Sequence, residues 1–189
     1  MKTIIEEKTY NNKDFTKEEF SIGEYEQCTF INCDLSNCNL SNSIFYKCTF
    51  AGCNLSLVKL KNTTFNDVSL KDCKLLGLHF DDCNTFLFAV TFDKCILNLS
   101  SFYKIKLKNS KFRNCSLHEV DFTETDFMGS LIENCDLSRA VFRNANLEKV
   151  DLRNSYNYSI DPEENRVKKA KFSLNGIRGL LDKYDIEIE

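Results

Sequence analysis

The ten cysteines of this chain all occupy the same position of a five-residue repeat, and six of them also follow one longer period. The positions of these six rise in steps of 20, 20, 22, 20 and 20, and each begins a Cys-x-Leu triplet: Cys33, Cys53, Cys73, Cys95, Cys115 and Cys135. A period of five within a period of 20 means that four repeats complete one turn of the chain. The sequence therefore predicts a solenoid, in which each unit buries its apolar side only by stacking on its neighbours.

The centre of each repeat is a large apolar residue that recurs every five positions over two runs. The first run extends from Phe15 to Phe80 and the second from Leu87 to Leu152, with 14 repeats in each. The position two residues before each centre holds Cys or another small residue, such as Ser43. Because residues i−2 and i of an extended segment point to the same side, both positions are predicted to face the interior, Leu87 included. The other three positions, which are mostly polar, are predicted to face water.

The order of a small residue, Asp or Asn, Leu or Phe, and then a polar residue resembles that of the pentapeptide-repeat proteins, in particular the Qnr and MfpA type. The segments CDLSN (33–37), CNLSN (38–42), CDLSR (135–139), ANLEK (145–149) and VDLRN (150–154) carry this resemblance. It implies an all-β fold, a right-handed quadrilateral β-helix of about seven coils. We expect an N-terminal cap or strand over residues 1–12, the β-helix over 13–155 and a C-terminal helical cap over 156–189.

The step from Cys73 to Cys95 is two residues longer than the other steps, which predicts an irregularity within residues 81–86. One interpretation is an inert bulge at a corner, because solenoids tolerate insertions in their loops. The other interpretation is a small protruding contact that involves Phe86 and Phe88.

The chain has a net charge of −3, and the charges of the predicted solenoid are spread over its four faces. The Cys-x-Leu face sums to about zero, the face of Phe80 and Phe122 to −2, the face of Tyr25 to −1 and the fourth to +1. These sums indicate neither the basic stripe that is typical of nucleic-acid binding nor a continuous acidic one.

The cysteines are interpreted as small buried hydrophobic residues. No apolar run approaches the ~18–20 residues that span a membrane, and the N-terminus lacks the apolar stretch of a signal peptide, so we expect a cytoplasmic protein. Structural disulfides are rare in that compartment. A metal site needs converging thiolates, whereas a ladder keeps them in a line, so we expect no metal and no cofactor. Metal or redox sensing by the ladder remains an alternative.

The regular repeat fades after Leu152, and signals of helix follow it. Asp161 as N-cap and Pro162 in the first turn predict a short helix. A second helix with one apolar stripe is predicted from Ser173, and residues 184–188 alternate as a final strand. This segment is expected to cap the last coil and to form a homodimer contact. The candidate residues for both roles are Phe172, Leu174, Ile177, Leu180, Leu181 and Tyr184.

Catalysis is not indicated by the sequence. His79 and His118 lie in outward positions far apart along the chain, and no glycine-rich loop for phosphate is present. The thiols are predicted to be buried, where they tend to be inert. We therefore expect a non-enzymatic protein that binds another protein, with no direct contact to nucleic acid or to a membrane.

The resemblance to Qnr and MfpA proteins implies a dimeric DNA mimic that binds DNA gyrase or topoisomerase IV, as in quinolone resistance. The surface that it implies as the contact would contain Asp81, Asp82, Phe86, Asp121 and Glu124. The alternative is a general protein-interaction scaffold without any effect on topoisomerases, because a fold alone does not specify function.

Overall fold

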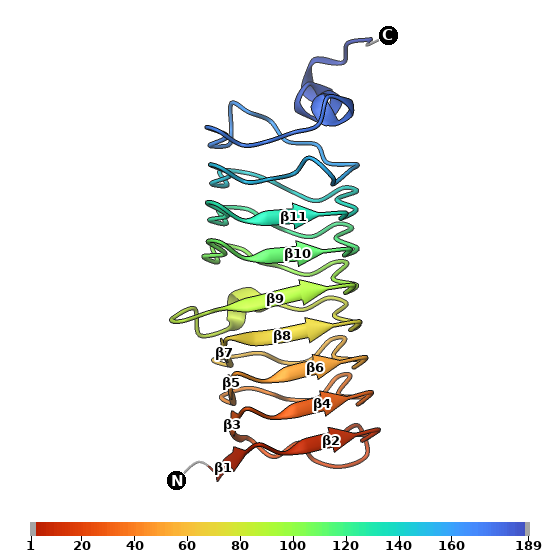
Figure 1. Cartoon of the computed structure of the whole chain (residues 1–189), viewed down its shortest axis with the longest axis vertical. Coiled ribbons are helices and arrows are strands. Elements are labelled where there is room, and N and C mark those ends of the chain that lie inside the picture. The colour runs from red at the N-terminus through yellow and green to blue at the C-terminus, as the bar shows by residue number, and fades with distance from the viewer. Residues whose placement is uncertain (1–2, 188–189) are drawn as a thin grey trace.

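The computed structural model describes residues 3–187, which form a rod of stacked parallel coils (Figure 1). Two parallel sheets run along the rod, with the strand orders β1-β3-β5-β7 and β11-β10-β9-β8-β6-β4-β2. The predicted β-solenoid is confirmed, with about seven turns and almost no helix. No helix within residues 3–187 has the length and apolar character needed to cross a membrane.

Neighbouring strands of each sheet are offset by one coil. Phe30 lies beside Phe50, as the regular period of the sequence requires, whereas Leu70 lies beside Phe92, two positions beyond that period. Isolated parallel bridges continue the same stacking on the sides that carry no strands. The first sheet contains β1 (Thr3–Glu6), β3 (Gly23–Glu26), β5 (Ile44–Tyr46) and β7 (Thr64–Asn66). The second contains β2 (Thr9–Asn11), β4 (Thr29–Ile31), β6 (Thr49–Ala51), β8 (Val68–Lys71), β9 (Val90–Asp93), β10 (Lys111–Arg113) and β11 (Leu131–Glu133).

The core consists of the central residues of the repeats, as predicted. Every predicted centre from Phe20 to Phe80 and from Phe92 to Leu152 is buried. Aromatic rings stack along the axis, with centroids 4.6 Å apart for Phe30 and Phe50. Offset stacking of this kind adds about 0.5–1.5 kcal/mol per pair to the burial of the rings.

Several of the small inward residues donate hydrogen bonds to the coil below them. The hydroxyls of Thr63 and Ser100 donate to the carbonyls of Leu40 and Leu75, each at 2.9 Å. The thiol of Cys53 donates to the carbonyl of Phe30 in the same way, at 3.4 Å. This shared contact explains why Cys, Ser and Thr alternate at one position of the repeat.

The second residue after each centre turns the chain onto the next side of the rod. It has a positive φ in nearly every repeat, and Asn occupies nine of these corner positions. Asn adopts the left-handed conformation more readily than most residues, so the corners explain the many asparagines of the repeat. Leu57 and Leu99 occupy corners of the same kind, with φ of 58° and 63° and exposed side chains.

The extra residues between β8 and β9 form a loop over residues 84–88. The prediction that Leu87 faces the interior is wrong, because its φ is 63° and 58% of its surface is exposed. Phe88 instead turns inward, with its ring 6.1 Å from that of Phe80 and 6.4 Å from that of Phe65. Cys83 keeps the small inward position, so the insertion lies after it. Phe80–Asp82 before it form the short 3-10 helix η1.

The stacking continues into the C-terminal segment. Parallel bridges join Asn146 to Arg166 and Asp151 to Lys171, within the range that was assigned to the cap. The helix predicted from Asp161 is wrong, because residues 162–164 form a turn. The reason is that Asn165 fills the small inward position and donates to the carbonyl of Phe142 at 3.0 Å. The backbone then joins the coil below, since the Arg166 amide donates to the carbonyl of Ala145 at 3.0 Å.

Two 3-10 helices follow, η2 (Asn175–Leu180) and η3 (Asp182–Tyr184). They form the helical module at the C-terminal end of the rod (Figure 1). The strand predicted over residues 184–188 is wrong as far as residue 187, because Tyr184 ends η3 and Asp185 has a φ of 49°. Ile188 lies outside the described residues.

Candidate partner-binding surface

The loop of residues 84–88 projects from the side of an otherwise regular rod (Figure 1). At its tip, 74% of the surface of Phe86 is exposed. Backbone hydrogen bonds fix its base. The backbone N–H of Asn84 donates to the carbonyl of Thr63 at 2.9 Å, and the backbone N–H of Ala89 donates to the carbonyl of Phe65 at 3.0 Å. Asn84 Oδ1 also accepts a hydrogen bond from the backbone of Phe86, at 3.1 Å. The loop therefore presents a large apolar side chain from an anchored backbone.

Asp81 and Asp82 lie in η1, immediately before this loop. Asp81 Oδ1 is 3.4 Å from Nδ1 of His79, which occupies the outward position before Phe80. Asp82 occupies the corner position, and its carbonyl accepts a hydrogen bond from the backbone of Asn62 at 2.9 Å. Both predicted aspartates therefore belong to the side of the rod that ends at the loop.

Asp121 and Glu124 lie on the same side, two coils further along the axis. Parallel bridges join His79 to Ser101 and Ser101 to Asp121, which places the three residues in one row. Glu124 lies in the corner row of Asp82, and its Oε1 accepts a hydrogen bond from the Tyr103 hydroxyl at 3.3 Å. The structure thus brings the four predicted acidic residues onto one side, with Phe86 around the next corner.

Tyr103 and Lys104, which the sequence did not single out as site residues, lie between the two acidic pairs. Lys104 has its Nζ 3.5 Å from Glu124 Oε2 and 4.7 Å from the centroid of the Tyr103 ring. Its contacts with Tyr103 and Glu124 raise the pKa of the Lys104 ammonium. The steps of 22 and then 20 in the series Asp82, Lys104, Glu124 could have revealed this position. The side therefore alternates in charge along the axis.

Most of the thiols lie in the interior of the rod. All ten cysteines are free, and all except Cys38 are buried. Burial raises the pKa of the Cys48 thiol to about 12, which keeps it protonated at neutral pH. Within residues 3–187, no group of three or more His, Cys, Asp and Glu side chains is placed to hold a metal ion.

The six predicted residues of the cap divide into two sets. Phe172 and Leu180 pack against the core, and Leu181 is half-buried, so these three close the end of the rod. Leu174, Ile177 and Tyr184 are exposed, and 84% of the surface of Leu174 faces solvent. Lys183 fixes the module to the last coil through ion pairs with Asp161 at 2.8 Å and Glu163 at 2.7 Å.

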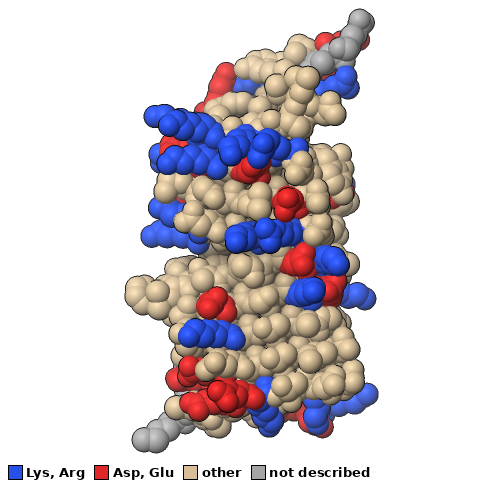
Figure 2. Space-filling model, in the orientation of Figure 1, with Lys and Arg blue, Asp and Glu red and all other residues tan. Residues whose placement is uncertain are grey.

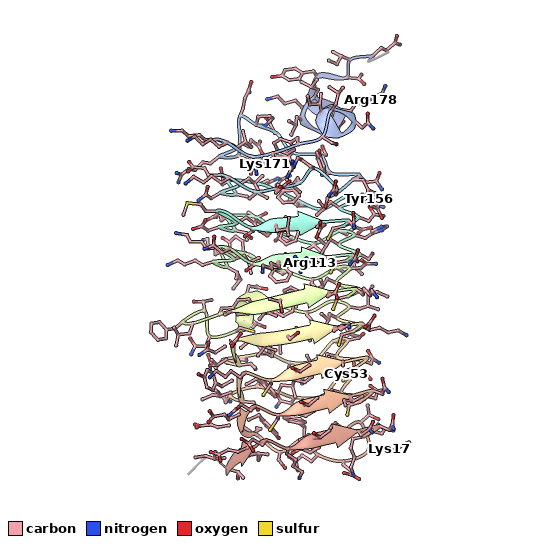
Figure 3. All side chains as sticks on the ribbon, in the orientation of Figure 1. Lys17, Cys53, Arg113, Tyr156, Lys171 and Arg178 are labelled. Carbon is pink, nitrogen blue, oxygen red and sulfur yellow. The ribbon has the colours of Figure 1, made fainter. Side chains whose placement is uncertain are left out.

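Hollows of the described structure are present at both ends of the rod. One of about 390 Å³ separates the last coil from η2 and is lined by Tyr156, Tyr158 and Arg178, two of which are labelled in Figure 3. Another of about 630 Å³ opens at the first coil, between Ile5, Tyr10 and Phe15. The loop that carries Phe86 projects from the side of the rod instead (Figure 1).

Comparison with known proteins supports the assignment that the geometry indicates. A family model described as the pentapeptide repeat region matches residues 24–86 and 85–157. A search of curated proteins found no match.

Two solved structures share the fold. A trypsin-treated form of QnrB1, a plasmid-mediated fluoroquinolone resistance protein, is 18% identical with a TM-score of 0.64, and 100% of this chain and 99% of that chain are covered. HetL from the cyanobacterium Nostoc sp., a pentapeptide repeat protein involved in the regulation of heterocyst differentiation, is 14% identical with a TM-score of 0.64. The match to HetL covers 90% of this chain and 85% of that chain. With the repeat matched over most of its length, the chain belongs to the pentapeptide-repeat family.

Proposed function

We propose that this chain is a non-catalytic protein-binding rod that engages DNA gyrase or topoisomerase IV. The observation that carries the proposal is the anchored loop with Phe86 at its tip, beside the side that holds Asp81, Asp82, Asp121 and Glu124. A solvent-facing aromatic side chain on a rigid support is the kind of residue that dominates binding energy at protein interfaces. The fold shared with QnrB1, a fluoroquinolone resistance protein, supports the choice of partner.

Mimicry of DNA would rest on the four carboxylates of that side. A DNA duplex carries one negative charge per ~1.7 Å of its axis. Here Lys104 stands between the two acidic pairs and His79 lies beside Asp81. We therefore propose that shape and the loop supply most of the affinity, and that the carboxylates orient the partner.

We propose in addition that two chains join through the C-terminal module. Leu174, Ile177 and Tyr184 offer an exposed apolar contact next to the part that caps the core. Sedimentation of the Leu174→Glu variant tests this contact, because a charge at this position should separate such a dimer while the fold is retained.

A gyrase supercoiling assay, with and without ciprofloxacin, tests the proposed partner. We expect stoichiometric protein to inhibit the enzyme or to protect it from the drug, and we expect Phe86→Ala to weaken this effect at least about tenfold, as for an interface anchor. Phe88→Leu is a matched control, since Phe88 faces the interior and should keep full effect.

The alternating charge of Lys104 and Glu124 favours a second candidate, a scaffold for a different protein partner. The same assay separates the two candidates. No effect on gyrase at a large excess of protein, at both low and high salt, would reject the topoisomerase proposal in favour of the scaffold.

A further inference from the structure

One side of the rod, which we term the loop face, consists of stacked four-residue segments on both sides of the loop. Below the loop it contains residues 4–7, 24–27, 44–47 and 64–67, which β1, β3, β5 and β7 hold in register. Above the loop it contains residues 106–109, 126–129, 146–149 and 166–169, which parallel bridges join. The loop thus has four segments below it and four above it.

The two halves of the loop face carry opposite net charges, although the total charge of its eight segments is zero. The four lower segments hold five acidic residues and one lysine, a net charge of −4. The four upper segments hold six basic and two acidic residues, a net charge of +4. Figure 2 shows acidic side chains gathered near the N-terminal end, basic ones near the C-terminal coils and an uncharged projection between them.

The charges at the two ends of this face have few partners within the chain. Among residues 3–187, no ion pair joins Glu6, Glu7, Glu24 or Glu26 to a basic side chain. In the same range none joins Lys106, Lys149, Lys168 or Lys169 to an acidic side chain.

The two acidic residues of the upper half are already neutralised. Asp126 pairs with Lys108 at 3.2 Å and Glu148 with Arg166 at 2.7 Å. The unmatched charges therefore gather at opposite ends of one face.

Consider two copies that face each other with antiparallel axes and are related by a two-fold axis at the height of the loop. Each lower segment of one copy then lies opposite an upper segment of the other, and the two segments carry complementary charges. Segment 4–7, with Glu6 and Glu7, falls on segment 166–169, with Arg166, Lys168 and Lys169. Segment 24–27, with two glutamates, falls on segment 146–149, where Lys149 is unpaired.

The two inner pairs of segments match in the same way. Segment 44–47, with Lys47, falls on segment 126–129, with Asp126, and Tyr46 falls on Met128. Asp67 falls on segment 106–109, which contributes Lys106 and Lys108. All four pairs of segments are complementary, and a surface that complements itself in this way is what a two-fold symmetric interface requires.

We propose that two copies of this chain pack with their loop faces together and their axes antiparallel, so that the two loops meet at the centre. Phe86 and Leu87 of each copy would supply the apolar centre, and the charged segments would form the surrounding contacts. This contact uses a different side of the rod from the C-terminal module. It buries the same Phe86 that the proposed topoisomerase contact uses, so the two contacts would exclude each other.

The physical roles of the two kinds of contact differ. Exposed ion pairs are worth about 0–1 kcal/mol each, so the charges mainly select the antiparallel orientation. The exposed phenylalanine and leucine of the loop supply the apolar burial. Because salt screens exposed charges beyond a Debye length of ~8 Å at physiological ionic strength, the dimer should weaken as salt rises.

The experiment uses sedimentation equilibrium of the full chain in a Leu174→Glu background, which removes the end contact proposed above. We expect a dimer at low salt, with an at least about tenfold weaker dimer at high salt. A lysine variant, Glu6→Lys with Glu7→Lys, and a glutamate variant, Lys168→Glu with Lys169→Glu, should each be monomeric alone, because segments 4–7 and 166–169 face each other. An equimolar mixture of the two should recover a dimer, since reversed charges then face each other in one half and native charges in the other.

Matched controls reverse charges of the same sign on other sides of the rod. Lys59→Glu with Lys61→Glu, and Glu18→Lys with Glu19→Lys, alter exposed residues outside the loop face and should leave the dimer intact. Circular dichroism would verify that each variant is folded. A monomer at every salt concentration overturns the proposal, as does a dimer that ignores both charge reversals or a mixture that stays monomeric.

Discussion

The hydroxyl of Thr125 donates a hydrogen bond of 2.8 Å to the carbonyl of Phe102, one coil below it. The Thr125 side chain is fully buried, and the same carbonyl also accepts from the backbone of Ile105 at 3.0 Å. The small inward position of the repeat therefore links successive coils by polar contacts as well as by packing.

Replacing Thr125 by Val should remove this link while the volume is kept. We expect the free energy of unfolding to fall by about 1 kcal/mol, the usual net worth of one hydrogen bond. Urea denaturation followed by circular dichroism measures the change. Thr91→Val is the control, because Thr91 faces solvent on β9 and its replacement should alter stability by less than about 0.5 kcal/mol.

Replacing Phe112 by Ala should destabilise the rod severely. Phe112 is completely buried and stacks on Phe92 at a centroid distance of 4.8 Å. The cavity should cost about 3–5 kcal/mol in unfolding free energy. The same substitution at Phe86, which is exposed at the loop tip, should change stability by less than about 0.5 kcal/mol. Equal losses for the two variants in urea denaturation would contradict the arrangement of interior and loop.

Replacing Leu57 and Leu99 by Asn should stabilise the protein. Both residues are exposed and adopt a positive φ at a corner, where Asn is favoured over Leu. We expect a gain of about 0.5–1 kcal/mol at each site, visible as a higher midpoint of thermal unfolding. Leu76→Asn is a suitable comparison, since Leu76 is also exposed but has no positive φ, and a gain there would argue against the corner explanation.

The free energy of unfolding should depend on pH through the carboxylate of Asp136. Burial opposes its ionisation, but hydrogen bonds from Ser138, His118 and Asn157 prevail and lower the pKa of Asp136 from 3.8 to about 2. The folded state binds this proton less readily than the unfolded chain does, so the contribution is complete above pH 3.8 and is lost as the pH falls towards 2.

Asp136→Asn removes the titrating group and tests this dependence. Between about pH 4 and pH 2, the unfolding free energy of the variant should decline less steeply than that of the unaltered protein. Urea titrations at several pH values provide the comparison. Parallel slopes would show that other carboxylates carry the whole dependence.

The period of five was sufficient to predict the solenoid and its core. It could do so because each central residue contacts its equivalents in the adjacent coils, so local sequence and long-range packing carry the same signal. The period could not locate the insertion. Counting back from Phe92 selects Leu87, whereas Phe88 returns to the interior because the extra residues enter after Cys83.

The C-terminal segment shows a different limit. Asp161 and Pro162 carry the local signals of a helix start, yet residues 162–164 form a turn and the chain returns to the coil below at Arg166. The competing signal was present, since Val167 and Phe172 lie one full period after Leu147 and Leu152. In the candidate site, the period of the repeat placed the acidic residues and Lys104 on one side. It could not show the ion pair between Lys104 and Glu124, which depends on the coil that lies beside each residue.

The pairing of β8 with β9 continues the seven-stranded sheet past the insertion without a break, whereas the four-stranded sheet ends at β7. The continuous sheet serves as a spine that sets the register of the upper coils independently of the loop. A change in loop length is therefore absorbed locally rather than transmitted along the rod. The position after Cys83 is consequently a natural graft site, where a foreign recognition peptide could be displayed on a rigid support.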